Sequence, residues 1–250
     1  MKKAIGWGVV VLAVATAASG QRNLREDTSA PASLVTLPDA SRWQAGLVYS
    51  RVSRQVELDG AEWKLRADVA DVFLGFAPVP WLLLYAQGGA SEGRLDKAMA
   101  EKASAGAGGL LGASLNLWQV HEGAQATAWR FTVQAAGQYA VRRTRDEGSG
   151  EIEWSEALVM LPLDYHLTFA RTFRNFYMAE FHSLHAYAGP AYSRIDGTWT
   201  RGASERDFEG SQDVGVVGGA DLWLLENLSF GARVEWFDET SMHVSVRYRF

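Results

Sequence analysis

The sequence predicts an all-β fold, an antiparallel transmembrane β-barrel of about ten strands. Three observations predict it. Apolar and polar residues alternate over many short segments, which is the period of a strand with one face in an apolar phase. Apolar residues make up 48% of the chain, yet beyond the N-terminus no uninterrupted run is long enough to cross a bilayer as a helix. Ten Trp, eight Tyr and 25 Gly suit short strands with interfacial aromatic residues better than a helical bundle.

The clearest strand signal is Trp129–Val141. Apolar residues fill one parity of this segment, and polar residues such as Arg130 and Gln134 alternate with them. Trp129 and Tyr139 lie near the two ends of the apolar face. At about 3.3 Å per residue and a tilt near 40°, they are about 25 Å apart along the membrane normal, the height of a barrel's lipid-facing band. The segment is therefore predicted to cross a bilayer.

Similar alternation marks ten segments, and even strand numbers are typical of bacterial single-chain barrels. Pro78 and Pro80 interrupt a stretch that is apolar enough for a transmembrane helix. Because each proline removes a backbone donor and restricts φ, a turn between two strands fits better. Eight strands is the alternative if a segment of unclear phase is not a full strand. The ten segments are Arg42–Val52, Glu62–Phe76, a strand from Trp81, Gly106–Val120, Trp129–Val141, Glu151–Ala170, Phe176–Ser193, Asp213–Leu224, Leu228–Phe237 and Thr240–Phe250.

The connections between these segments alternate in length. With the N-terminus on the inner side, the even-numbered connections lie on that side, and all four are short: Ala77–Pro80, His121–Gln125, Arg171–Asn175 and Leu225–Asn227. The longest polar stretches, Ser91–Ala105 and Arg194–Gln212, are the third and seventh connections, so they are predicted to be loops on the outer side. Aromatic residues near the outer loops are expected to anchor the membrane interface: Trp154, Tyr192 and Trp199.

Residues 1–20 are typical of an export signal. Lys2 and Lys3 precede an apolar segment, Ala4–Ala15, and small residues follow it. A membrane anchor is the alternative, but the apolar core is short and no stop-transfer flank follows. Gln21–Ser41 is predicted to be a polar connector, and residues 42–250 the barrel domain.

Composition and motifs argue against several classes of site. The chain has no cysteine, which excludes disulfides and cysteine-ligated metals. The net charge of −5 gives no reason to expect a nucleic-acid partner. His182 and His185 differ in parity, so on a strand they occupy opposite faces and chelation is not expected. With no phosphate-binding glycine loop either, neither a metal nor a cofactor is predicted.

The last segment, Thr240–Phe250, has one apolar and one cationic face and stops on an aromatic residue. It resembles the closing strand of the small bacterial outer-membrane β-barrel proteins, and the resemblance extends over Arg42–Phe250. It implies the outer membrane of a Gram-negative-type cell, contact with outer-membrane lipid, and recognition by the outer-membrane assembly machinery. In that family the assembly signal lies in the terminal strand, which corresponds here to Met242, Val244, Val246, Tyr248 and Phe250.

The interior of the barrel is predicted to carry a salt-bridge network that fills a narrow lumen. In Glu62–Phe76 the residues Lys64, Arg66 and Asp68 oppose apolar neighbours and are assigned to this network; the phase becomes unclear near Asp71, where a bulge is an option. The predicted network comprises Lys64, Arg66, Asp68, Arg130, Asp164, Asp221, Arg233, Glu235, Arg247 and Arg249.

The sequence favours a structural or surface-interaction role, with an extracellular ligand bound through Ser91–Ala105 and Arg194–Gln212. No catalytic residue is assigned. The alternative is a lipid-modifying hydrolase. His243 and Ser245 share a strand face, and Glu235 lies on the preceding strand. This set of residues resembles the catalytic residues of a His/Ser/Glu lipid deacylase. The asparagine which that family's pattern requires does not follow Ser245. A narrow pore is the third hypothesis.

Overall fold

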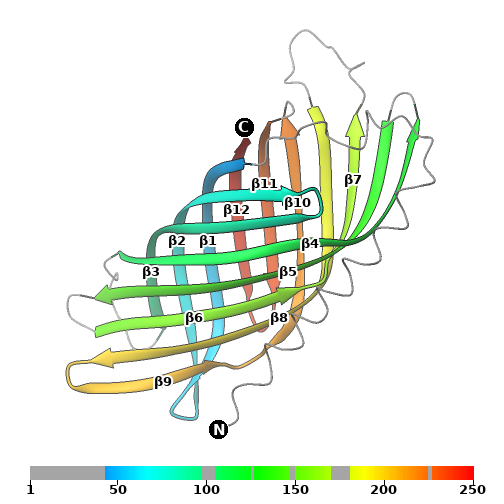
Figure 1. Ribbon diagram of the computed structural model, residues 1–250. Coiled ribbons are helices and arrows are strands. Elements are labelled where there is room, and N and C mark those ends of the chain that lie inside the picture. Colours follow the sequence, from blue (N-terminus) through cyan, green and yellow to red (C-terminus); the bar gives the residue numbers. More distant parts are fainter. Residues whose placement is uncertain (1–42, 97–104, 125–126, 147–149, 170–180, 225–226) are drawn as a thin grey trace.

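The computed structural model describes residues 43–96, 105–124, 127–146, 150–169, 181–224 and 227–250. Within them the chain is all-β (Figure 1). The predicted signal, the predicted connector and the predicted turn Arg171–Asn175 lie outside the described residues. No helix among the described residues is long and apolar enough to span a membrane.

Twelve strand segments form a closed antiparallel barrel of ten strands. β6 and β7 are two parts of one strand, because β5 and β8 each pair with both. β9 and β10 form another, because both pair with β8. The segments are β1 (Trp43–Leu58), β2 (Ala61–Val79), β3 (Leu82–Asp96), β4 (Gly106–Ala124), β5 (Thr127–Asp146), β6 (Gly150–Met160), β7 (Leu163–Phe169), β8 (Phe181–Arg201), β9 (Ser204–Gly210), β10 (Val214–Leu224), β11 (Leu228–Trp236) and β12 (Thr240–Arg249).

The barrel closes through β1, which pairs with two different strands. Its first half pairs with β12, from Gln44 opposite Arg249 to Arg51 opposite Met242. The β11–β12 hairpin is short, and beyond its tip β1 pairs with β9, for example Leu58 with Phe208. The tip of that hairpin is held from the side of β1 by two backbone donors: Ser53 N donates to Ser241 Oγ at 3.0 Å and Gln55 N to Asp238 Oδ2 at 2.7 Å.

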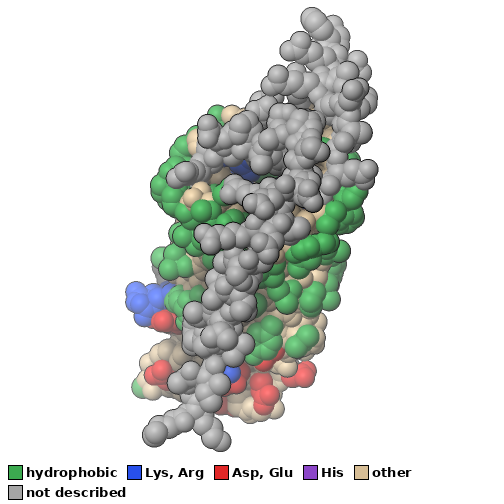
Figure 2. Space-filling view, turned by 45° about the vertical axis from the view of Figure 1, so that its right-hand side comes forward, with side chains coloured by type: hydrophobic (Ala, Val, Ile, Leu, Met, Phe, Trp, Pro, Cys, Tyr) green, Lys and Arg blue, Asp and Glu red, His purple; other side chains and the backbone are tan. Residues whose placement is uncertain are grey.

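An apolar belt surrounds the barrel wall. Its side chains lie on the outward face, and several are more than 60% exposed (Leu47, Val72 and Leu111). Exposed apolar surface of this extent, contributed by every strand, is stable only in an apolar phase, so the belt is the membrane-spanning surface. Aromatic residues mark its two edges, Tyr49, Tyr139, Tyr192 and Trp236 at one and Trp43, Trp118, Tyr248 and Phe250 at the other. Figure 2 shows these apolar side chains along the wall, with charged side chains gathered toward one end.

Beyond the first of these edges the strands continue as a charged extension, here called the head. It comprises residues 51–58, 61–69, 91–96, 142–146, 150–156, 193–201 and 204–210. In Figure 1 the head is the end with the β1–β2 and β8–β9 turns, opposite the C-terminus. A strand enters the head without a change of phase, but its outward face passes from lipid into water.

β2 shows this transition. The prediction that Lys64, Arg66 and Asp68 face the interior is wrong: they share the outward face with Val72. No bulge occurs at Asp71, because β2 stays in register with β1 from one end to the other. On the outward face, the residues from Ala70 toward the C-terminal end of β2 are apolar, and those from Asp68 toward its N-terminal end are charged. The strand leaves the membrane between Ala70 and Asp68.

The interior of the head is an apolar core. Its side chains come from opposite walls, with β1, β2 and β3 on one side and β6, β8 and β9 on the other, and they are at most 7% exposed. Because protein cores are packed at the density of organic crystals, this cluster closes the barrel at the head end. The core consists of Val56, Leu58, Leu65, Ala67, Val69, Leu95, Ile152, Trp154, Ile195, Trp199 and Phe208. The prediction that Trp154 and Trp199 anchor the membrane interface is therefore wrong; Tyr192 is exposed on the outward face.

The predicted loop Arg194–Gln212 is instead a hairpin of β8 and β9. The turn falls at Gly202, whose φ of 62° lies in the left-handed region. The stretch is rich in polar residues because its outward face meets water, while Ile195 and Phe208 are buried in the head core. Likewise β3 continues to Asp96, well into the predicted loop Ser91–Ala105; residues 97–104 of that loop lie outside the described part.

Candidate functional site

A buried polar cluster joins β1, β11 and β12 inside the barrel. His243 Nδ1 lies 2.8 Å from Ser50 Oγ, and its Nε2 lies 3.2 Å from Glu235 Oε1. Arg233 also reaches this carboxylate, at 3.0 Å. Ser50 is 8% and Glu235 4% exposed, so the carboxylate contacts both the Arg233 guanidinium and the His243 imidazole in a space closed on the head side. This arrangement ties β12 to β1 across the point of closure.

Ser245, the nucleophile of the predicted hydrolase, lies elsewhere. A Cβ at Gly231 would lie 2.6 Å from Ser245 Oγ, so this hydroxyl lies beside Gly231 rather than next to His243. The structure thus brings His243 and Glu235 together but places Ser50 at the histidine. Sequence reasoning missed Ser50 because 193 residues separate it from His243.

Asp71 and Arg142 form a second interior cluster. Arg142 donates through two nitrogens to the Asp71 carboxylate, with Nη1–Oδ1 at 2.8 Å. Both side chains are at least 93% buried, and they connect β2 with β5 across the interior. Beside them, Thr144 Oγ1 accepts from Gly93 N at 3.1 Å, which adds a contact between β5 and β3. The uninterrupted parity of β2 was the sequence signal that would have placed Asp71 inside.

The other interior charges lie mostly toward the C-terminal end of the barrel. Arg130 Nη2 is 2.9 Å from His166 Nδ1, and the rings of His166 and His185 are 3.7 Å apart. Arg249 stacks over Trp223 at 4.2 Å, and Arg247 is paired with Asp221. The predicted network residues on the inward face are Arg130, Asp164, Asp221, Arg233, Glu235, Arg247 and Arg249, and the interior also holds Arg54, Asp71, Arg142 and Glu156. In the described part of the chain no three His, Asp or Glu side chains are placed to hold a metal ion.

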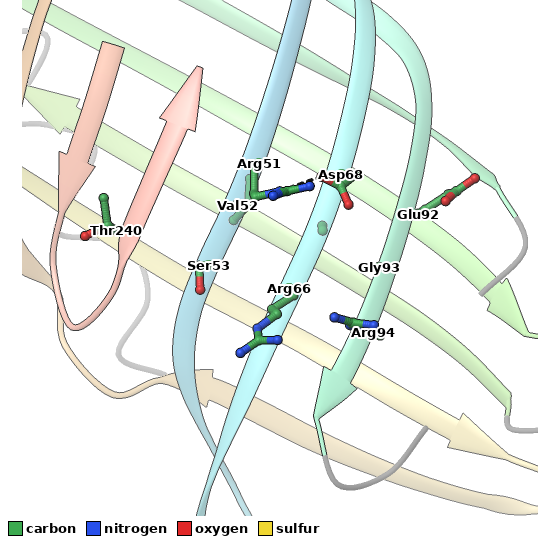
Figure 3. A pocket seen from close by; sticks show the side chains of 10 residues that line it. Arg51, Val52, Ser53, Arg66, Asp68, Glu92, Gly93, Arg94 and Thr240 are labelled. Atoms are coloured by element: carbon green, nitrogen blue, oxygen red, sulfur yellow. Dashed lines mark hydrogen bonds and ion pairs between the residues drawn. The ribbon is translucent and has the colours of Figure 1, made fainter. Parts of the chain in front are cut away.

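A charged groove of about 420 Å³ lies on the outward face of the head (Figure 3). Its side chains come from consecutive cross-strand rows of β1, β2 and β3. The row next to the belt contains Arg51, Asp68 and Glu92, and the next row contains Arg66 and Arg94. Figure 3 shows Arg51 directed toward Asp68, with the second row farther from the belt.

Asp68 is the carboxylate most strongly held in this groove. The Tyr49 hydroxyl donates to its Oδ1 at 2.6 Å, and Arg51 Nε donates to the same oxygen at 3.0 Å. These contacts stabilise the ionised form and hold the pKa of Asp68 below its usual range, against the opposing effect of partial burial. Arg51 is therefore neutralised within the groove.

Comparison with known proteins finds solved bacterial outer-membrane barrels that are similar to this chain at low sequence identity. No protein-family model matches it, and no curated protein matches it in sequence. The translocator domain of the autotransporter NalP from Neisseria meningitidis is similar at 13% identity and a TM-score of 0.35, over 94% of this chain and 98% of that one. The outer-membrane protease OmpT from Escherichia coli is similar at 10% identity and a TM-score of 0.40, over 87% of this chain and 100% of that one. An outer-membrane channel from Pseudomonas putida F1 is similar at 10% identity and a TM-score of 0.37, over 89% of this chain and 100% of that one.

Proposed function

We propose that the protein is a non-conducting outer-membrane barrel that presents its head at the cell surface as an interaction module. The observation that carries this proposal is the apolar core of the head. An ion path through the barrel would have to pass between side chains such as Leu65 and Ile195, which are at most 1% exposed. The outward face of the head is by contrast densely charged, as expected of a surface that meets water and binding partners.

The absence of cysteine allows a direct test of this arrangement. Single variants Ala203→Cys, in the β8–β9 turn, and Pro80→Cys, in the β2–β3 turn, lie at opposite ends of the barrel. In intact cells a membrane-impermeant maleimide is expected to label Ala203→Cys alone, and both after lysis. The purified protein in planar bilayers is expected to show no stepwise current. The opposite labelling pattern would contradict a surface-exposed head, and stable open channels would contradict a closed barrel.

The terminal strand is proposed to carry the assembly signal. Met242, Val244, Val246, Tyr248 and Phe250 all point outward, and the rings of Tyr248 and Phe250 stack at 6.4 Å. Replacing Tyr248 and Phe250 with Ala is expected to leave most of the chain unassembled in cells, measured as loss of the heat-modifiable folded band. Tyr139→Ala removes an equally exposed belt aromatic far from the terminus and is the matched control. Equal losses in both variants would show a general need for belt aromatics instead.

Ester hydrolysis is the second candidate function, and the contact among Ser50, His243 and Glu235 is the arrangement that it would use, with Ser50 as the nucleophile in place of Ser245. A fluorophosphonate probe tests it, because such probes label activated serines. We expect no labelling, because Ser50 and Glu235 are buried and Glu235 is also paired with Arg233. Labelling that disappears in Ser50→Ala and persists in Ser245→Ala would favour the hydrolase.

A further inference from the structure

Two arginines of the head groove share one carboxylate. Arg66 on β2 lies directly opposite Arg94 on β3. Both reach Asp96, with N–O distances of 3.2 Å from Arg66 and 3.6 Å from Arg94. Like charges directly opposite each other on neighbouring strands are destabilising. Arg66, Arg94 and Asp96 together carry one excess positive charge. A bound anion would offset the repulsion between the two guanidinium groups.

These guanidinium groups also remain open to a ligand. The side chains of Arg66 and Arg94 are 45% and 50% exposed, and both line the groove of about 420 Å³. A guanidinium presents a planar fork of donors that matches phosphate oxygens, whereas an ammonium is a point charge. Two such forks on adjacent strands offer several donors to one phosphate group.

The position of the pair relative to the membrane selects the source of the anion. Ala70 is the outward apolar residue of β2 nearest the head, and Arg66 lies four residues before it in the chain, on the head side. Four residues of a strand tilted by about 40° rise about 10 Å, and both arginine side chains are directed at Asp96, one cross-strand row farther from the belt. Bilayer headgroups occupy about 5–8 Å beyond each side of the hydrocarbon core. The guanidinium groups therefore lie just beyond the headgroup layer, where phosphate groups that project from this layer reach them.

We propose that Arg66 and Arg94 bind a phosphate group of a lipid headgroup at the foot of the head. The proposal rests on the membrane placement given under the proposed function. Arg51 is not part of this site, because Asp68 neutralises it. Glu92 lines the same groove two residues from Arg94, so its negative charge opposes anion binding and weakens the affinity.

The site is tested with the full chain in phosphatidylcholine nanodiscs that contain a small fraction of lipid A, which carries phosphate monoesters. Retained lipid A per barrel is measured by native mass spectrometry. The double variant Arg66→Gln/Arg94→Gln is expected to lose about tenfold in affinity, since each charge-assisted contact is strong. Arg66→Lys/Arg94→Lys is expected to lose less, because charge remains without the fork. Glu92→Gln is expected to bind more tightly than the wild type.

The control is Arg143→Gln/Arg145→Gln, a pair of more exposed head arginines on β5. An equal loss in this control would show nonspecific attraction and overturn the site. Inorganic phosphate, added to nanodiscs that lack lipid A, distinguishes the sources: competition at micromolar phosphate would assign the pair to the free ion. Heat-modifiable mobility is recorded for every variant. A wild type that does not insert would refute the membrane placement, whereas an inserted wild type without lipid A selectivity would refute only this inference.

Discussion

The Asp71→Asn variant is expected to lose about 3–5 kcal/mol of its free energy of unfolding, because it leaves the Arg142 guanidinium buried without its counter-charge. Asp71 and Arg142 are each at least 93% buried in the interior, where the belt meets the head, and joined by two hydrogen bonds. The loss is measured by reversible urea unfolding in lipid vesicles, followed by tryptophan fluorescence.

Two control variants separate the buried charge from other effects of the substitution. Asp68→Asn changes an exposed carboxylate three positions along the same strand, and its expected cost is below about 1 kcal/mol. The double variant Asp71→Leu/Arg142→Met removes both charges and is expected to recover most of the stability, since apolar replacements of buried ion pairs are often neutral. A double variant as unstable as Asp71→Asn would show that the pair contributes more than charge compensation.

The Phe208→Ala variant is expected to loosen the head while the membrane-spanning belt stays folded. Phe208 is 1% exposed and packs so closely on β8 that a Cβ at Gly197 would lie 2.2 Å from its ring. Truncating a buried Phe to Ala costs about 3–5 kcal/mol. A local loss of 3 kcal/mol corresponds to about a hundredfold faster amide exchange in the affected hairpin.

Hydrogen exchange resolved by segment is the appropriate measurement. Protection is expected to fall in β8–β9 and in the end of β1 that pairs with β9, and to stay unchanged in β11 and β12. Glu209→Ala, at the neighbouring exposed position of β9, is the matched control and is expected to have little effect. A uniform loss of protection over the whole barrel would contradict the idea that the head core is a separable unit.

Inside the membrane, the alternation of the sequence was sufficient to predict the strands. In β5 and β12 the apolar parity predicted from the sequence is the outward parity in the structure, because lipid surrounds the wall along that length. The ten-strand count is confirmed. The connections predicted at Ala77–Pro80 and His121–Gln125 are also short in the structure, although β2 and β4 reach farther into them, and β10 and β11 end and begin on either side of Leu225–Asn227 as predicted.

Outside the membrane, the same pattern has the opposite meaning. In the head the inward face is apolar and the outward face charged. The density of polar residues therefore suggested a loop at Arg194–Gln212, and the alternation of apolar and polar residues suggested that Arg66 faces inward. An alternating pattern reports which face is apolar, but it does not report whether lipid or protein covers that face. The position where a strand leaves the bilayer, such as Ala70, is needed to decide.

The interior clusters could be predicted only in part. The position of Arg233 in the alternating pattern assigns its side chain to the inward face. The residue that it contacts depends on the shear of the barrel and on which strands face each other across the interior. Contacts such as Ser50 with His243 join positions 193 residues apart and follow from closure rather than from local pattern.

The double pairing of β1 also bears on the order in which the chain folds. One strand near the start of the described chain needs both β9 and β12, which lie about 150 to 200 residues later, before its backbone donors and acceptors are satisfied. Contacts so distant in sequence form slowly, because the chain loses the entropy of closing a long loop before the new contacts stabilise it. Docking of β1 is therefore expected to be the last, rate-limiting step of folding, and it joins the head and the membrane wall in one cooperative event.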